Sequence, residues 1–314
     1  MLHKTSYLIF SNRLYKIGSA YKNVGIEDEK KLVKQFLANR KIKEHVVKYL
    51  TSSLQSIGYS AQTIKELIDL LTTMQIKKFQ DKNYAELKAV HSIEFFQKIV
   101  PKYFENYIVP YIPPSNKLLD IGCGTGILAY VLSKSDRFKQ ILGIDIDEYL
   151  EWKKFNNKKI KFQIINQNNF GQFLAENKPD TIIMTWTLHH MSYEEQESYL
   201  KNIYDILPKV RIVILEDAYA ATISPIKDIG VYDSFMMFNE KDRAKIMSVY
   251  DWIANRVLER RDKIPIPFAY RTLEEWRMFF EKIGFKIISE KFIGFPEKRD
   301  INTPQSLLVI EKWI

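Results

Sequence analysis

The hydrophobic positions of the chain follow two different patterns, one before and one after residue 112. Over residues 28–100, apolar side chains recur every three or four positions, as at Leu32, Phe36, Ile64 and Leu67, and glycine and proline are scarce. This spacing is typical of amphipathic helices. We therefore predict an α-helical N-terminal region that extends over residues 1–112.

Three prolines in VPYIPPSNK (Pro110, Pro113 and Pro114) interrupt the helical pattern, because proline lacks a backbone donor. A domain boundary is expected here, with a second domain over residues 113–314. Short apolar runs then alternate with helix-length segments: KLLDIG, QILGIDI, KFQIIN, DTIIMTW and VRIVILED, followed by GFKIISEKFIGF and SLLVIEKWI. The first five runs predict parallel βαβ units in a doubly wound α/β sheet, and the last two predict an antiparallel edge pair.

Glycines concentrate at one point of this second pattern. The chain has 11 glycines in 314 residues, yet Gly122, Gly124 and Gly126 fall within five residues after the first apolar run. In a doubly wound sheet this turn lies where ligands bind, and glycine lets a ligand lie directly on the main chain. The G-x-G-x-G spacing differs from the G-x-G-x-x-G dinucleotide fingerprint, so we expect a ligand without a pyrophosphate.

The segment LLDIGCGTG closely resembles the first motif of class I S-adenosylmethionine-dependent methyltransferases. The resemblance extends from about Leu118 to the C-terminus and leaves the helical first third as a variable cap. It implies a seven-stranded Rossmann-like sheet, S-adenosylmethionine as methyl donor and S-adenosylhomocysteine as product. The LHH segment that follows the fourth apolar run is similar to that of small-molecule members of the family.

The same resemblance implies a set of cofactor-binding residues. Asp120 is expected near the amino and carboxyl ends of the cofactor, the three loop glycines and Cys123 beside its methionine and ribose, and Thr185 at the end of the fourth run. Asp145, 19 residues after Gly126, is expected to accept both ribose hydroxyls, with Ile146 against adenine. The alternative for Asp145 is a helix N-cap.

The third run departs from the common family pattern. In place of an acid that accepts a hydrogen bond from the adenine amino group, the chain has Gln167 and Asn168 in INQNNFGQF. An amide oxygen can accept the same hydrogen bond. The alternative is a polar turn without contact to the cofactor.

Candidate catalytic residues follow the fourth and fifth runs. His189 and His190 suit a general base, because histidine titrates near neutral pH, although such histidines can also be structural. Glu216 and Asp217 could orient an amine or polarise a hydroxyl, whereas Asp217 could instead cap a helix. Methyl transfer is an in-line displacement that requires no metal, so none is predicted.

An insertion of about 50 residues, over 220–270, precedes the amphipathic segment RTLEEWRMFFEKIGF. It is rich in Met and aromatic residues, which either belong to the core or form an apolar wall over a substrate. In the family such an insertion usually forms part of a lid over the acceptor. We therefore expect a partly apolar acceptor.

Charge and cysteine content bear on the binding partners and the cellular location of the protein. Residues 1–100 carry 17 Lys and Arg against 9 Asp and Glu, and the rest of the chain carries 30 against 29. The basic region either binds nucleic acid, an acidic carrier protein or an anionic surface, or is a solvated helical face. The single cysteine, the absence of a signal-like N-terminus and the short apolar runs predict a cytoplasmic protein without a membrane span.

Three functions are compatible with these features. The first is methylation of an O, N or activated C of a small-molecule acceptor, free or carrier-bound. The second is RNA methylation through the basic helices, although the Asn/Asp-Pro-Pro-Tyr/Phe tetrapeptide and an acceptor-site cysteine are missing. The third is a non-catalytic binding subunit, which the intact glycine loop and Asp145 disfavour. The sequence leaves the oligomeric state open.

Overall fold

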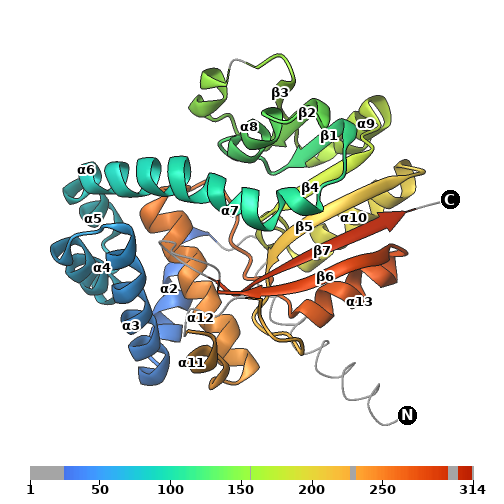
Figure 1. The fold of residues 1–314 in the computed structure, drawn as a ribbon. Helices are drawn as coiled ribbons and strands as arrows, with labels where there is room; N and C mark the ends of the chain where they lie inside the picture. Colours follow the sequence, from blue (N-terminus) through green and yellow to red (C-terminus); the bar gives the residue numbers. More distant parts are fainter. Residues whose placement is uncertain (1–24, 156, 227–230, 296–302, 313–314) are drawn as a thin grey trace, which may run out of the picture.

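The computed structural model describes residues 25–155, 157–226, 231–295 and 303–312. Its centre is one seven-stranded sheet with the strand order β3-β2-β1-β4-β5-β7-β6 (Figure 1). The strands are β1 (Ser115–Ile121), β2 (Phe138–Asp145), β3 (Ile160–Ile164), β4 (Thr181–Thr185), β5 (Val210–Asp217), β6 (Lys286–Gly294) and β7 (Gln305–Lys312). The first five pair in parallel, and β7 lies antiparallel to both β5 and β6. The predicted doubly wound, Rossmann-like sheet with an antiparallel edge pair is confirmed.

Helices cover both faces of the sheet because its central strands are apolar on both sides. On one face pack α9 (Gln167–Asn177), α10 (Tyr193–Ile206) and α13 (Leu273–Ile283). On the other pack α7 (Val100–Tyr107) and α8 (Ile127–Ser133). Capping boxes define two of the helix starts: Ser192 with Glu195 begins α10, and Thr272 with Glu275 begins α13.

A helical cap lies beside the sheet and is built from two distant stretches of the chain (Figure 1). The first stretch holds α2 (Ile26–Leu37), α3 (Arg40–Ile57), α4 (Ala61–Thr73), α5 (Ile76–Lys82) and α6 (Tyr84–Glu86). The second holds α11 (Tyr232–Met236), α12 (Glu240–Trp252) and η5 (Ile253–Leu258). Their apolar faces form one cluster, in which Leu50, Phe235, Tyr250 and Trp252 are almost fully buried. Most aromatic residues of the insertion are therefore core residues.

A long helical run joins the cap to the sheet. It consists of η1 (Leu87–Ile99) and α7, and Figure 1 shows it crossing from α6 to the edge of β1. Residues 95–112 already pack with sheet residues such as Leu118 and Val213. The short η2 (Val109–Tyr111) and the following prolines then lead into β1. Residues 95–112, which precede Pro113 and Pro114, therefore pack as part of the sheet domain.

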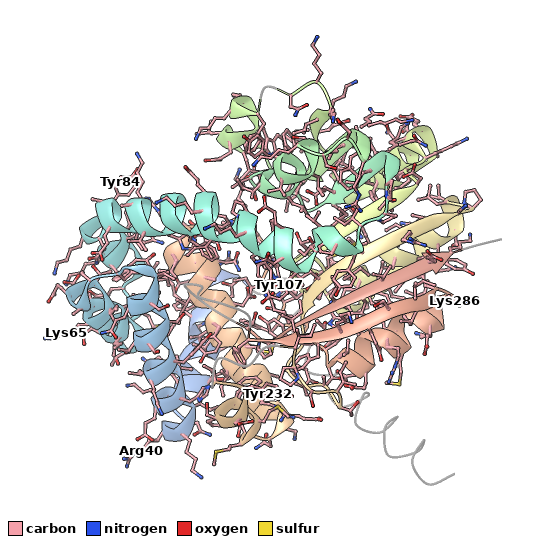
Figure 2. All side chains as sticks on the ribbon, viewed as in Figure 1. Arg40, Lys65, Tyr84, Tyr107, Tyr232 and Lys286 are labelled. Atoms are coloured by element: carbon pink, nitrogen blue, oxygen red, sulfur yellow. The ribbon has the colours of Figure 1, made fainter. Side chains whose placement is uncertain are left out.

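The basic residues of the cap are spread over its outer surface. Arg40 and Lys65 project outward from α3 and α4 in Figure 2, and several lysines pair with acids one helical turn away. Exposed pairs of this kind suit a solvated helical face. Among the residues that the structure describes, no helix combines the length and hydropathy needed for a membrane span.

Candidate active site

The glycine loop lies at the carboxyl ends of the central strands, between β1 and β4, where the strand order reverses. Gly122, Gly124 and Gly126 have φ values of 69°, 51° and 80°, which favour glycine. A Cβ on Gly122 would lie 2.5 Å from Thr187 Oγ1, and one on Gly126 would lie 2.5 Å from Phe162 Cζ. A Cβ on Gly124 would meet no atom within 4 Å. The first and third glycines thus allow close packing, and the second leaves space for a ligand.

Asp145 ends β2 and faces this loop. Its carboxylate accepts hydrogen bonds from the backbone N–H groups of Gly124, at 2.8 Å, and Ile146, at 2.7 Å. Burial raises the pKa of Asp145, and these N–H groups offset part of the effect. The next helical turn, η3, begins only at Leu150, so Asp145 does not act as a helix N-cap.

A cavity of about 230 Å³ opens beside Asp145. Ile146 and Gln167 line it together with the loop, and the Ile146 side chain is 58% exposed there. Gln167 begins α9, whose N-cap is Asn166. Asn168 is exposed and does not line this cavity, so of the two amides only Gln167 lies at the site.

Asp120 is fully buried on β1, two residues before Gly122. Neither of its carboxylate oxygens has a hydrogen-bond partner within the described part of the chain. Burial, and then the nearby Asp145 charge, raise its pKa to about 8. An unsatisfied buried carboxyl group suits a cationic or hydrogen-bond-donating ligand above it.

A second cavity, of about 140 Å³, lies on the other side of the loop. It is lined on one side by apolar residues of η1 and α7, including Phe95 and Phe104, and on the other by polar residues of the strand ends. The two cavities share Gly122, Gly124, Trp186, His190 and Arg261 as lining residues. The two cavities are therefore adjacent, and these five residues form a wall that they share.

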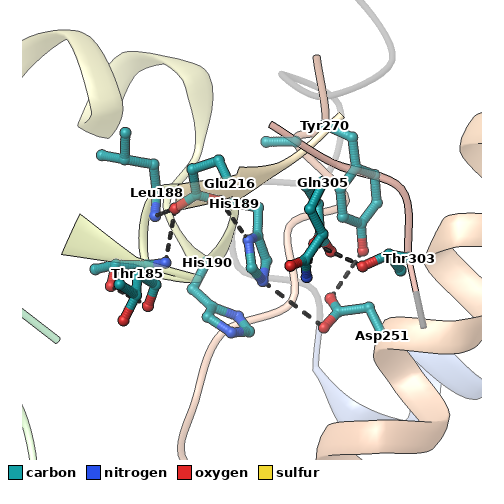
Figure 3. A network of polar contacts seen from close by, with 12 residues as sticks. Thr185, Leu188, His189, His190, Glu216, Asp251, Tyr270, Thr303 and Gln305 are labelled. Atoms are coloured by element: carbon teal, nitrogen blue, oxygen red, sulfur yellow. Dashed lines mark hydrogen bonds and ion pairs between the residues drawn. The ribbon is translucent and has the colours of Figure 1, made fainter. Parts of the chain in front are cut away.

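Both histidines lie in the short η4 (Leu188–His190) (Figure 3). His190 belongs to the shared wall, and His189 lines the smaller cavity only. His189 Nδ1 lies 2.7 Å from Glu216 Oε2, and Glu216 Oε1 accepts from the N–H groups of Thr187 and Leu188. His190 Nδ1 donates to the carbonyl oxygen of Pro265 at 2.9 Å. Glu216 therefore fixes the position of η4 as well as the orientation of the His189 ring.

The two histidines carry different charges at neutral pH. Burial alone would lower the pKa of His189, but the charge and hydrogen bond of Glu216, followed by the charges of Asp217 and Asp251, raise it to about 10. Burial and the neighbouring His189 lower the pKa of His190 to about 4. At pH 7, His189 is thus an imidazolium and His190 a neutral imidazole whose Nε2 has a free lone pair.

Asp217 ends β5 and lines the smaller cavity. Thr303 and Gln305 donate to its Oδ1, at 2.6 and 3.3 Å, and no described helix follows it directly, so the capping alternative does not apply. Burial raises its pKa to about 6, against the opposing effects of His189 and Thr303. A carboxyl group that titrates there can accept a proton near neutral pH.

The predicted site residues thus gather around two adjoining cavities. The smaller one is lined by Gly122, Cys123, Gly124, Thr185, His189, His190 and Asp217. The larger one is lined by Gly122, Gly124, Asp145, Ile146, Gln167 and His190. Asp120, Gly126 and Glu216 line neither cavity and lie behind the wall that they support.

The sequence analysis missed the polar residues that the insertion contributes. Asp251, Asn255 and Glu259 line the smaller cavity, and Arg261 lines both. The first three are spaced four residues apart, with Asp251 at the end of α12, Asn255 in η5 and Glu259 directly after η5, so they lie on the same side of this helical run. Polar residues at this regular spacing within an apolar segment could have indicated in the sequence that the insertion contributes to the site.

The fold and the glycine loop define a doubly wound protein that binds a nucleoside-type ligand at the switch point of its sheet. The family model described as "Methyltransferase domain" matches residues 92–290, which is more than half of the chain. The chain belongs to this family and is a class I S-adenosylmethionine-dependent methyltransferase.

Curated relatives are distant. A 24-methylenesterol C-methyltransferase 2 of Arabidopsis thaliana is 26% identical over 187 residues, 59% of this chain and 45% of the relative. An uncharacterized methyltransferase of Anoxybacillus flavithermus is 29% identical over 126 residues, 38% of this chain and 58% of the relative. The chain thus spans about half the length of these two relatives.

Two solved structures of methyltransferases are similar to this chain at low identity. The Burkholderia thailandensis 1,6-didemethyltoxoflavin-N1-methyltransferase, with S-adenosylhomocysteine bound, is 14% identical, with a TM-score of 0.44 over 74% of this chain and 85% of that one. A mitomycin 7-O-methyltransferase is also 14% identical, with a TM-score of 0.45 over 88% and 70%.

The described residues fit the cofactor of this family, S-adenosylmethionine. Asp145 presents a carboxylate to the larger cavity, Gly124 leaves open space beside it, and the Asp120 carboxyl group is unsatisfied below the loop. These are the three features that a nucleoside with a cationic amino acid end requires.

Proposed function

We propose that this methyltransferase modifies an O, N or activated C of a small, partly apolar acceptor that binds in the smaller cavity. The observation that carries the proposal is the wall shared by the two cavities, because it would bring an acceptor next to the cofactor. The small volume and the Phe95 and Phe104 lining favour a compact metabolite.

In this proposal the larger cavity holds the cofactor. Asp145 accepts the ribose hydroxyls and releases the Gly124 N–H in doing so, Ile146 packs on adenine, and Gln167 accepts from the adenine amino group. The glycine loop holds the methionine end, with the buried Asp120 carboxyl group behind the loop. Bound S-adenosylmethionine supplies an activated methyl group.

The residues of the smaller cavity would position the acceptor and receive its proton. His189 is already protonated and held between Glu216 and Asp251, so we do not assign it the role of base. Asp217 is the stronger candidate, because its raised pKa lies close to neutral pH and its Oδ1 is fixed by Thr303 and Gln305. In-line methyl transfer would require these residues to hold the acceptor atom opposite the sulfur of the cofactor, and Asp217 would receive any proton that the acceptor releases.

The test is transfer of a labelled methyl group from S-adenosylmethionine into a cell extract. We expect RNase-insensitive label in the small-molecule fraction. Asp145→Ala should abolish this label and weaken S-adenosylhomocysteine binding, measured by calorimetry, by roughly 10-fold or more through the lost hydrogen bonds. Asp136→Ala, at an exposed acid away from both cavities, is the control and should behave as wild type.

Other outcomes would redirect the proposal. RNase-sensitive label in RNA would assign the acceptor to nucleic acid and the basic cap to its binding. Label on a small acidic protein would indicate a carrier-bound acceptor. Unchanged cofactor binding in Asp145→Ala would show that the cofactor does not lie in the larger cavity.

A further inference from the structure

Three metal-type donor groups converge at the wall of the smaller cavity. They are His189 and His190 in η4 and Asp251 at the end of α12, and one ligand atom from each lies within 4.8 Å of the other two. His189 Nε2 and Asp251 Oδ1 are 3.9 Å apart. Figure 3 shows both imidazole rings and the Asp251 carboxylate on the same side of the strand ends.

Hydrogen bonds hold both imidazole rings through their Nδ1 atoms and leave each Nε2 as the remaining donor atom. The Nδ1 of His189 faces a Glu216 carboxylate oxygen at 2.7 Å, and the Nδ1 of His190 faces the Pro265 carbonyl oxygen at 2.9 Å. Because these oxygens only accept hydrogen bonds, each Nδ1 carries a hydrogen, and a bound metal ion would take the place of the second proton, on Nε2, that His189 carries in the metal-free protein. Metal-binding histidines are oriented in this way by a carboxylate or carbonyl behind the ring.

Hydrogen bonds also fix the third donor, Asp251. Asp251 Oδ2 accepts from the Tyr270 hydroxyl at 2.8 Å, and Oδ1 accepts from Asn255 Nδ2 at 2.7 Å. Asp251 is 5% exposed and His189 is 3% exposed. Three donors on two separate elements are thus fixed by neighbours that do not belong to the donor set.

We propose that His189, His190 and Asp251 bind one divalent transition-metal ion at the wall of the smaller cavity. Two imidazoles and one carboxylate suit ions such as Zn²⁺, Co²⁺, Fe²⁺ or Mn²⁺ better than Mg²⁺ or Ca²⁺. Ligand atoms around such an ion lie roughly 3 to 3.5 Å apart, so the donors, which are now 3.9 to 4.8 Å apart at most, would have to move closer by side-chain rotation when the ion binds. The sequence analysis predicted no metal because methyl transfer requires none, and Asp251 lies some 60 positions from the two histidines, so no ligand-spacing motif joins them.

Three protein ligands leave coordination positions open, and these face the cavity that we assign to the acceptor. An acceptor with a hydroxyl, enol or carboxylate oxygen would bind there, and the ion would favour the deprotonated oxygen. This extension to the acceptor rests on the proposed function, whereas the metal site itself does not.

The test uses the whole protein, freed of metal with a chelator and titrated with Co²⁺ and then Zn²⁺. We expect one equivalent of Co²⁺ to give a visible absorption band that Zn²⁺ displaces. His190→Gln and Asp251→Asn should each weaken binding by roughly 10- to 100-fold or more, since loss even of a residue behind a ligand costs that much. His45→Gln, in the cap beside Phe238, is the control and should bind Co²⁺ like wild type.

Two results would overturn the metal site. One is the absence of stoichiometric Co²⁺ binding by the wild type, which would leave His189 and Asp251 as a proton-sharing pair. The other is unchanged binding in both variants, which would place the ion elsewhere. S-adenosylhomocysteine affinity is measured in parallel with and without metal. If the protein binds S-adenosylhomocysteine but no metal, the metal site is rejected and the proposed function is not.

Discussion

At the scale of single residues, the buried acid Asp120 carries an energetic cost that its position explains. The carboxyl group is completely buried and has no partner among the described residues. Because burial raises its pKa from 3.8 to about 8, the ligand-free folded protein holds a proton there at pH 7 that the unfolded chain has released. The glycine loop is thus built over a group that favours a bound cation.

This cost should appear as a pH dependence of stability. A raised folded-state pKa contributes stability that is complete below about pH 4 and is lost as the pH rises to about 8. We therefore expect the melting temperature of the ligand-free protein to fall between pH 5 and pH 8, and Asp120→Asn, which cannot ionise, to reduce that slope. Calorimetry at several pH values measures it. Asp136→Asn, at an exposed acid, should keep the wild-type slope, and an equally steep slope in Asp120→Asn would contradict the prediction.

At the scale of elements, the loop between β1 and α8 combines packing with ligand space. Gly126 is closed in by Phe162 of β3, and Gly124 faces open space and lines both cavities. Stability and binding thus depend on different glycines of one motif.

Two alanine substitutions separate these roles. Gly126→Ala should cost about 2 to 4 kcal/mol, because its Cβ would clash with Phe162 and its φ is 80°. Gly124→Ala should cost only about 1 to 2 kcal/mol for its φ of 51°, yet weaken S-adenosylhomocysteine binding roughly 10-fold or more, because its Cβ enters the ligand space. Thermal unfolding and calorimetry distinguish the two. If Gly126→Ala and Gly124→Ala lost the same stability and bound S-adenosylhomocysteine with the same affinity, the two glycines would not have separate roles.

The sequence predicted the elements of the sheet, because they follow from local patterns, and the cofactor-binding roles that it implied remain predictions. Apolar runs define the strands, and the spacing from Gly126 to Asp145 places both at the same sheet edge. The acceptor side was not predictable in this way. The pKa of His189 is raised by Glu216, which is distant in the chain, and the pKa of His190 is lowered by burial and by His189. Asp251 reaches the cavity only through packing of the cap.

At the scale of the whole molecule, one buried ion pair ties the two stretches of the cap together. Arg256 in η5 donates to both carboxylate oxygens of Glu29 in α2, at 2.7 and 2.8 Å, and both side chains are almost fully buried. Arg256 also donates to the carbonyl oxygens of Arg261 and Ile264. The pair therefore supports the segment that carries Arg261 to the wall between the cavities.

Breaking this pair should affect both folding and binding. Arg256→Met leaves Glu29 buried and unpaired and should cost about 3 to 5 kcal/mol. S-adenosylhomocysteine affinity should fall with it, because residues 261–264 lose their anchor. Urea unfolding and calorimetry provide the measurements. The double variant Glu29→Leu/Arg256→Met should recover part of the stability, and Arg40→Met, at an exposed pair with Glu44, should cost less than about 1 kcal/mol. A loss in Arg256→Met no larger than in Arg40→Met would contradict the prediction.

Because the cap is built from two distant stretches of the chain, its first helices are synthesised well before the helices that cover them. Helices α2 to α5 leave the ribosome about 150 residues before α12 and η5, which cover their apolar faces. At 5 to 20 residues per second, this interval lasts roughly 8 to 30 s. Through that time Leu50 and its neighbours lack their final contacts, so the nascent chain offers a binding surface to chaperones. The cap closes only when translation has passed the fifth strand of the sheet.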